Sequence, residues 1–419
     1  MSIKDIGMPQ KQPFFYGYFM VGALLATAIA MWSPYYAFGV FFKPVLNEFG
    51  WSRALTSGAF SLALVMNGLM AILLGRLNDK LGPRVVIATC GLVLGVGYTL
   101  MSQVNAVWQM YLFYGVIVGG AMGGGFVPQA STVARWFIKR RSLMTGIVVA
   151  GTGIGMLAGP LIATRLISAY DWRMSFLIMG GIAGVVVVII AQFLKFDPAR
   201  AGLRPYGEST AKGTELRLPV SSYSIEEAIR TSQFWLAFGL VSCYGFLLFA
   251  IMVHFVPYLT DAGTSETSAA SLLATIGIMS VIGKTVLGSV GDKIGNKKML
   301  FISFIFWALS HLWLLAATEE WMLFLFAIIF GIAYGGNSAS HSPLVARLFG
   351  LGSHGLIFGA VSFGVMIGGA AGPFVAGYVF DTTGSYRIAF LLSAFVGVLG
   401  VILTALLRPT RLEPGGKRW

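Results

Sequence analysis

The chain has 419 residues, of which 57% are hydrophobic and only 11% are charged. Soluble domains carry about 25% charged residues, so this composition excludes a soluble protein. With a mean hydropathy of +0.80, it indicates a protein that crosses a membrane many times. The net charge of +13 could suggest a nucleic-acid partner, but the positions of the charges, described below, argue against one. The two cysteines fall in apolar runs and provide neither a disulfide framework nor a metal site.

Polar breaks divide the sequence into twelve apolar segments, each near the length of about 20 residues that a helix needs to cross a bilayer. Because backbone polar groups must be satisfied within the lipid, we expect an all-α membrane protein with twelve transmembrane helices. The expected spans are 15–42, 53–76, 84–104, 107–134, 142–168, 173–195, 230–260, 267–290, 297–316, 321–346, 355–380 and 386–407.

A polar interval with several prolines and glycines lies between the sixth and the seventh segment. We therefore predict an N-terminal six-helix bundle at 1–195, a cytoplasmic linker at 196–229 and a C-terminal six-helix bundle at 230–419. The end of the linker, from Ile225 to Arg230, has the pattern of a short amphipathic helix that leads into the seventh span.

The basic residues indicate how the chain lies in the membrane. With the N-terminus in the cytoplasm, 23 of the 29 Lys and Arg residues fall in cytoplasmic segments. This asymmetry follows the enrichment of positive charge in cytoplasmic loops. We therefore expect a multi-pass protein of the cell (inner) membrane with both termini cytoplasmic, whose basic character reflects topology and not a nucleic-acid partner.

The two halves share an internal repeat. A motif of two glycines and an aspartate occurs twice, displaced by 213 residues: GRLNDKLG, with Gly75, Asp79 and Gly82, and GSVGDKIG, with Gly288, Asp292 and Gly295. An Ala-Gly-Pro stretch at 158–160 returns at 371–373 with the same displacement. Two pseudo-symmetric bundles that face each other can rock about a central site, which then opens to alternate sides.

The stretch GRLNDKLGPR, from Gly75 to Arg84, resembles the cytoplasmic loop signature of the major facilitator superfamily. Its glycine permits close approach of two helices, and Asp79 can accept hydrogen bonds from a helix N-terminus or pair with a basic side chain. The resemblance implies the major facilitator fold, and we predict that the motif closes the cytoplasmic side. We assign this gating role to Asp79, Arg84 and Asp292.

A second stretch, WFIKRRSLMTGIVVAG from Trp136 to Gly151, is similar to the fifth-helix signature of the monocarboxylate porter family. Trp136 stands where the family usually has Tyr, and Met144 and Val148 replace small residues. The FYGY opening of the first span is weakly similar to the same family's first-helix signature. This resemblance implies a carrier of small carboxylates.

Lys284 is the basic residue that lies far from both ends of an apolar segment. Eight residues separate it from Asp292, and eight helical residues span about 12 Å, roughly twice the reach of a lysine side chain. The sixteen acidic residues all map to a terminus, a loop or a helix end, so the expected partner of Lys284 is a substrate anion. The alternative is a permanent structural pairing with a neighbouring helix.

In the monocarboxylate porter resemblance, Lys284 falls at the arginine that anchors the substrate carboxylate. Lysine keeps the charge but loses the two-pronged hydrogen bonding of arginine. The animal carriers also have an aspartate where this chain has Ser280 and a first-helix lysine where it has Tyr36, so their coupling mechanism does not transfer directly.

Lys284 is our candidate for the group that carries the coupling proton. A buried lysine can lose its proton while the site is empty and regain it as a carboxylate binds. The other hypothesis is that the proton travels on the substrate, bound as the neutral acid.

The remaining substrate-binding candidates are neutral polar residues near the middle of the spans, which can hydrogen-bond a carboxylate without adding charge. They are Tyr35, Tyr36, Asn67, Tyr114, Ser280, Tyr334 and Asn337. Each one taken alone is also explained as a satisfied polar group between helices. The four histidines, His254, His311, His341 and His354, are expected to be packed or interfacial.

We predict no catalytic residue, metal site or cofactor, and hence no enzyme. The expected partners are the lipid bilayer, a small carboxylate such as lactate or pyruvate, and a proton carried with it by symport; the chain is expected to act as a monomer. Two alternatives remain. One is exchange of organic anions of the oxalate–formate type without net proton movement, and the other is a carboxylate sensor that does not transport.

Overall fold

The computed structural model describes residues 15–51, 53–199, 202–207 and 222–408. Within these residues, 12 helical stretches are long and apolar enough to cross a membrane. The helices are α1 (Tyr16–Tyr36), α2 (Phe38–Phe49), α3 (Arg53–Leu81), α4 (Pro83–Met101), α5 (Val107–Met110), η1 (Tyr111–Val118), α6 (Gly119–Met122), η2 (Gly123–Gly125), α7 (Val127–Trp136), α8 (Arg141–Ala169), α9 (Trp172–Ala191), α10 (Ile225–Ile229), α11 (Ser232–Asp261), α12 (Glu266–Ile294), α13 (Asn296–Leu314), α14 (Glu320–Phe349), α15 (His354–Thr383) and α16 (Arg387–Leu406). The predicted all-α class is confirmed.

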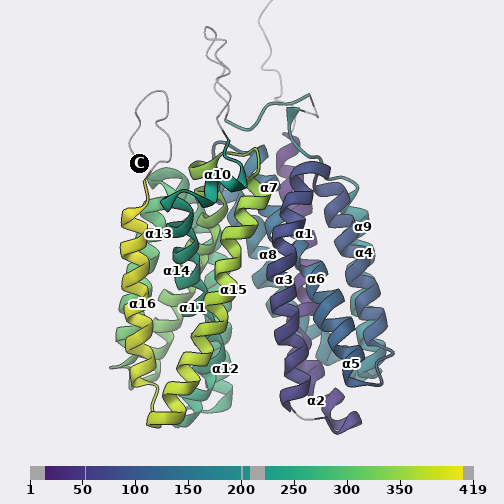
Figure 1. The fold of residues 1–419 in the computed structure, drawn as a ribbon. Helices are drawn as coiled ribbons and strands as arrows, with labels where there is room; N and C mark the ends of the chain where they lie inside the picture. Colours follow the sequence, from purple (N-terminus) through teal and green to yellow (C-terminus); the bar gives the residue numbers. More distant parts are fainter. Residues whose placement is uncertain (1–14, 52, 200–201, 208–221, 409–419) are drawn as a thin grey trace, which may run out of the picture.

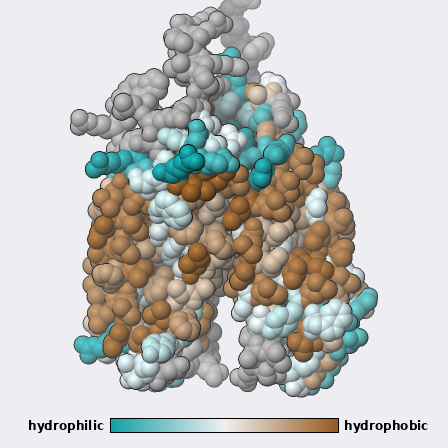
Figure 2. All heavy atoms as spheres, in the orientation of Figure 1, coloured by the Kyte–Doolittle hydropathy of each residue, from teal (hydrophilic) through white to brown (hydrophobic). Residues whose placement is uncertain are grey.

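The helices form two bundles, one from α1 to α9 and one from α11 to α16 (Figure 1). The bundles contact each other through α3 with α15 and through α8 with α12. They lie close together at the end that carries α10, here called the linker face, and part toward the end that carries α2, here called the opposite face. The space-filling view shows a gap between the bundles at the opposite face (Figure 2).

The division at 1–195, 196–229 and 230–419 remains a prediction, and each of the three ranges includes residues outside those described. Within the linker, the expected short helix is present as α10. Its N-terminus has a capping box, in which Ser224 accepts from the backbone of Glu227 and Glu227 accepts from the backbone of Ser224.

Each bundle has its own apolar core. Aromatic rings fill the first one, where Phe41 stacks on Phe176 with ring centroids 3.8 Å apart. In the second, Trp307 stacks on Phe330 with centroids 5.4 Å apart. The outer surface is a belt of apolar side chains (Figure 2), as expected for a surface that faces lipid.

Several helices extend past the apolar segments that predict them. The helix α3 continues to Leu81 and α12 to Ile294, four or five residues beyond the expected ends, because backbone hydrogen bonding continues into the polar residues. Both helices stop at a glycine, Gly82 with φ 86° and Gly295 with φ 93°, a conformation that other residues rarely adopt. Asp79 and Asp292 therefore belong to the last turns of helices.

The fourth span is not the continuous helix expected at 107–134. It contains a π-helical stretch, η1, and a 3₁₀ turn, η2, before α7 begins. The backbone leaves helical geometry at Phe126, with φ −136° and ψ −63°. Glycines permit the irregular path, since Gly119 packs directly on the backbone of Ala63, and Gly123 on that of Ala71.

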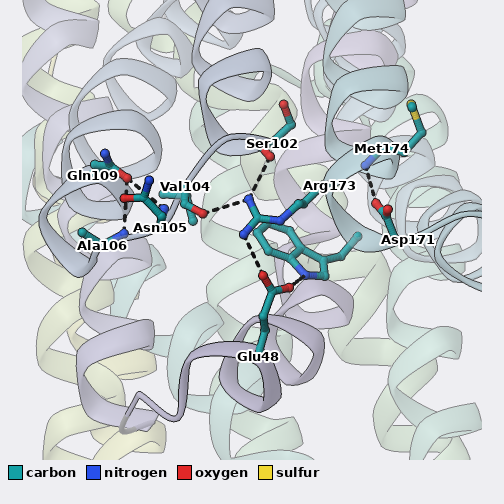
Figure 3. A network of polar contacts seen from close by, with 10 residues as sticks. Glu48, Ser102, Val104, Asn105, Ala106, Gln109, Asp171, Arg173 and Met174 are labelled. Atoms are coloured by element: carbon teal, nitrogen blue, oxygen red, sulfur yellow. Dashed lines mark hydrogen bonds and ion pairs between the residues drawn. The ribbon is translucent and has the colours of Figure 1, made fainter.

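At the opposite face, a polar network fastens α2 to the rest of its own bundle (Figure 3). Glu48 accepts hydrogen bonds from Trp172 Nε1 at 2.6 Å and from Arg173 Nη2 at 2.7 Å. Arg173 also donates to the carbonyls of Ser102 and Val104, at 3.0 and 2.8 Å. The guanidinium of Arg173 and then the indole of Trp172 hold the pKa of Glu48 below its usual value. All these residues belong to the first bundle, so this network does not tie the two bundles together.

Candidate substrate cavity and its closure

A cavity of about 120 Å³ lies between the two bundles. It is smaller than the 300–1,000 Å³ typical of pockets for drug-sized ligands, so it suits a small solute. Both bundles line it: α1, α3 and α8 with residues around them on one side, and α11, α14 and α15 on the other. The described residues that form the wall include no aspartate, glutamate, lysine or arginine, and the titratable groups among them are His341 and tyrosines.

Lys284 lies directly behind this wall, on α12, and is fully buried. Its Nζ donates to Thr152 Oγ1 at 3.1 Å and lies 4.7 Å from the centre of the Tyr334 ring. Both of these residues line the cavity. The ammonium group of Lys284 therefore contacts two residues of the cavity wall without lining the cavity itself.

The approach of α8 to α12 explains this geometry. A Cβ atom on Gly146 would overlap the carbonyl oxygen of Lys284, so glycine allows the two helices to touch at this level. The Thr152 hydroxyl donates to the carbonyl of Val149 at 2.8 Å, which leaves its oxygen lone pairs to accept from Lys284.

The contacts that Lys284 makes do not compensate for the free energy that burying its charge costs. An ammonium group has three donors, and the described contacts satisfy one of them, with a ring face as the second attraction. A cation–π contact contributes about 0.5–2 kcal/mol, whereas desolvating an ion costs several kcal/mol. The described contacts of Lys284 include no carboxylate, and the ion pairs Arg135–Asp79 and Arg173–Glu48 involve other residues.

Three other predicted binding residues line the cavity: Tyr36, Asn67 and Tyr334. Tyr36 stacks on Trp32, with ring centroids 5.2 Å apart. Asn67 is 8% exposed. These residues come from α1, α3 and α14, so the structure brings together polar groups from both bundles.

The structure does not bring the remaining candidates to the cavity wall. Tyr114 donates to the backbone carbonyl of Tyr35 at 3.1 Å, and the two rings are stacked. The hydroxyl of Tyr35 is buried near Asn67 without a hydrogen bond of good geometry. Ser280 donates to the carbonyl of Gly277, one turn back in its own helix.

Asn337 is also behind the wall, and its side-chain oxygen bonds His341 Nε2 at 2.7 Å. His341 itself lines the cavity and packs edge-on against Tyr244. The other histidines are packed elsewhere. His254 bonds Pro373 O and Tyr386, His311 bonds Trp307 O, and His354 bonds Ser342 O.

Sequence reasoning missed several lining residues. Tyr244 on α11 and Thr152 on α8 are polar groups at mid-span, the same signal that selected Tyr334. Trp32 was not distinguishable from the other aromatic residues of the first span. Its indole donates to the carbonyl of Gly125 at 3.0 Å, where η2 leaves that carbonyl accessible.

On the linker face, Asp79 closes the contact between α3 and α15. Its carboxylate accepts from the backbone N–H groups of Gly355 and Leu356, each at 3.0 Å, and from Arg135 Nη2 at 2.7 Å. Gly355 and Leu356 lie in the first turn of α15, so a negative charge here meets the positive end of a helix in the other bundle. We call this set of contacts the Asp79 latch.

Asp292 makes the corresponding contact from the C-terminal bundle to the N-terminal bundle. Its carboxylate accepts from the backbone N–H of Ser142 at 2.8 Å and of Leu143 at 2.9 Å, in the first turn of α8. Ser142 and Leu143 correspond to Gly355 and Leu356 through the same displacement of 213 residues that relates Asp79 to Asp292. The repeat therefore includes both partners of this contact, here called the Asp292 latch.

Arg84 takes no part in either latch. Its side chain is exposed and donates to Gln192, the residue that follows α9 in its own bundle, at 3.0 Å. The described contacts thus place Asp79 and Asp292, but not Arg84, between the two bundles.

Comparison with known proteins agrees with this arrangement. Residues 14–283 and 242–418 match the family described as the Major Facilitator Superfamily. Monocarboxylate transporter 13 of Rattus norvegicus is 26% identical over 374 residues, which cover 88% of this chain and 84% of that protein. Monocarboxylate transporter 4 of Rattus norvegicus is 27% identical over 380 residues, covering 89% of this chain and 79% of that one.

Among solved structures, that of the MFS proton:xylose symporter XylE bound to 6-bromo-6-deoxy-D-glucose has a TM-score of 0.74 to this chain. The identity is 13%, with 94% of this chain and 97% of that one covered, so this likeness concerns the fold alone.

The family match and the relatives place the chain in the class of multi-pass membrane transporters rather than enzymes. The chain belongs to the Major Facilitator Superfamily. Within it, the chain is related to the monocarboxylate transporters.

Proposed function

We propose that the protein transports small monocarboxylates such as lactate or pyruvate by alternating access, together with a proton. The observation that carries this proposal is Lys284, a fully buried lysine against the cavity wall whose described contacts include no carboxylate. The names of the relatives, monocarboxylate transporters 13 and 4, support the same class of substrate.

In this proposal the carboxylate enters from the opposite face and is bound by hydroxyl and amide groups of the lining, among them Tyr36 and Asn67. Lys284 supplies the positive charge that attracts the carboxylate, from its position behind Thr152 and Tyr334. Because an arriving anion favours the charged form of a lysine, substrate binding and proton binding promote each other. Taking a proton along also removes the opposition of the membrane potential, about 2.3 kcal/mol per charge per 100 mV.

We further propose that the linker face is cytoplasmic, that the protein lies in the cell membrane, and that a single chain is sufficient for transport. The basic residues that flank the latches, such as Arg135 and Arg141, support this orientation.

Proteoliposomes loaded with a pH-sensitive dye test the proposal. External lactate should acidify the lumen, and pyruvate should compete. Flux that requires a carboxylate on the inside, without acidification, would instead identify an exchanger. This second candidate is favoured by the described lining of the cavity, which offers no carboxylate to carry a proton. Binding without any flux would identify a sensor.

Variants of Lys284 test its role within the same assay. Replacing a buried charged partner of a carboxylate costs about 1.5–3 kcal/mol, so Lys284→Ala should weaken lactate binding by about 10- to 150-fold. Lys284→Arg should keep binding, since it preserves the charge. Thr285→Ala is the matched control on the same helix, because Thr285 bonds only carbonyls of its own helix. Unchanged binding in Lys284→Ala would remove this lysine from the site.

A further inference from the structure

A second hollow lies outside the transport cavity, at the linker face of the C-terminal bundle. It is an open groove of about 500 Å³ where α13 packs between α14 and α16. Its walls combine apolar residues, Ile294, Phe301, Ile302 and Ala405, with the basic residues Lys297, Lys298 and Arg347. None of the described lining residues is acidic.

The three basic residues have different tasks. Lys297 donates to the carbonyls of Ala405 at 2.9 Å and Leu407 at 2.7 Å, and so caps the end of α16. Lys298 and Arg347 have exposed side chains that line the groove. The groove therefore has a positive potential, to which the N-terminus of α13 adds.

The apolar part of the groove continues along the membrane-facing surface. Phe301 and Ile302 are each 36% exposed, and further along α13 Phe306 is 44% and Leu309 56% exposed. Figure 2 shows hydrophilic side chains at the linker-face end of the molecule and the apolar belt directly beside them. A ligand that fits both parts has a negatively charged head and long apolar chains.

The corresponding place in the N-terminal bundle is built differently. Lys298 and Arg347 correspond through the repeat to Val85 and Ala134, so the basic pair is missing there. The turn at Gly82 is covered by Phe196, whose ring would lie 3.0 Å from a Cβ on that glycine, whereas nothing lies within 4 Å of the same position at Gly295. The groove is thus a feature of one bundle and not a consequence of the shared fold.

We propose that this groove binds one anionic glycerophospholipid, with its phosphate at Lys298 and Arg347 and an acyl chain along Phe301 and Ile302. Basic pockets between transmembrane helices suit anionic lipid headgroups. A soluble phosphate would use only the basic pair and leave the apolar wall uncovered. The chain's own segment 409–419 is a weaker candidate, because its sequence has three basic residues and one acidic residue, so its net charge has the same sign as the groove.

Native mass spectrometry of the purified full chain tests the proposal with phosphatidylglycerol and phosphatidylethanolamine of matched acyl chains. We expect tighter retention of phosphatidylglycerol, and an affinity about tenfold lower in the variant Lys298→Ala/Arg347→Ala. The control Lys80→Ala/Arg230→Ala removes the same two residue types from exposed positions at the same face and should bind as the parent does.

Three outcomes would overturn the proposal. The first is equal loss of phosphatidylglycerol in both double variants, which would mean general attraction to a basic protein. The second is displacement of the lipid by glycerol phosphate, which would mean that the groove recognises the headgroup alone. The third uses a photoreactive residue at Ile302 in the full chain: cross-links to residues 409–419 in place of lipid would identify the chain's own segment as the occupant.

Discussion

The Asp79 latch and the Asp292 latch have the same backbone geometry but different surroundings. Each aspartate accepts from two successive N–H groups at the start of a helix in the other bundle. The side chain of Asp79 is only 8% exposed and is paired with Arg135, whereas Asp292 is exposed. The repeat position of Arg135 is occupied by Leu348, so the ion pair belongs to one latch.

This difference shows that a duplicated contact can keep its geometry while its strength diverges. Hydrogen bonds to a charged acceptor are stronger where water is excluded, and exposed charges are screened by solvent and salt. The α3–α15 contact should therefore contribute more than the α8–α12 contact to keeping the linker face closed.

The largest effect is expected from Asp79→Asn. The amide has one acceptor oxygen in place of two, so it can keep only one of the bonds from Gly355 and Leu356 and directs N–H groups at the other donor. The negative charge that strengthens both bonds is also lost. The closed linker face should lose about 2–3 kcal/mol relative to the open state, a change of about 30- to 150-fold in the equilibrium. Spin labels at the exposed residues Leu81 and Arg230 would report this change as a new population with a longer distance between the labels.

A distance distribution identical to that of the parent would show that Asp79 has no part in closure and contributes only to the shape of the loop. Asp261→Asn is the control, because this exposed carboxylate at the end of α11 lies outside both latches. Lactate affinity, measured separately, should change much less than the distance populations do.

A smaller effect is expected from Asp292→Asn. One of the two backbone bonds is lost and the other loses its charged acceptor. Water can replace the lost bond at an exposed site, so the closed state should lose about 1 kcal/mol, or about fivefold. The spin labels at Leu81 and Arg230 measure this shift as well. A shift as large as that of Asp79→Asn would mean that the burial of Asp79 adds nothing to closure, and the contrast between the latches would disappear.

The sequence alone predicts one part of this comparison well. The displacement of 213 residues relates Asp79 to Asp292 through the repeated motif itself, and an aspartate that ends a helix in this motif is expected to meet a helix N-terminus or a basic side chain. The identity of the partners, in the first turns of α15 and α8, depends on how the bundles dock, which local sequence does not specify. Arg84 illustrates the limit: it lies in the same motif, yet it bonds Gln192 of its own bundle.

For the cavity, too, the sequence predicts some features and not others. The depth of Lys284 follows from counting residues along an apolar segment, because a helix has a fixed rise. Thr152 has the same signal, a polar group at mid-span, but its pairing with Lys284 could not be predicted, because it depends on how α8 is placed against α12. Tyr114 and Ser280 have the expected position along their spans, but their hydroxyls donate to backbone carbonyls of their own bundle. Depth is therefore readable from sequence, whereas the direction in which a side chain points depends on helix packing.

The smallest shift in the conformational balance is expected from Arg135→Gln. Arg135 and Asp79 belong to the same bundle, so their ion pair does not have to break when the linker face opens. Removing the guanidinium makes it harder to desolvate Asp79 on closing, but it also leaves the full negative charge of Asp79 for the N–H groups of α15. These effects oppose each other, and the balance should change by less than about 1 kcal/mol.

The loss should instead appear in thermal stability, because the pair is only 12% and 8% exposed and Arg135 also lies 4.7 Å above the Phe196 ring. We expect unfolding to be destabilised by about 1–3 kcal/mol, with Arg135→Lys recovering part of it through the retained charge. Parallel measurements of spin-label distances and of thermal unfolding separate the two readouts. If Arg135→Gln opened the linker face as far as Asp79→Asn does, the strength of the Asp79 latch would come from its ion pair, and the shared backbone bonds would be equally weak on both sides.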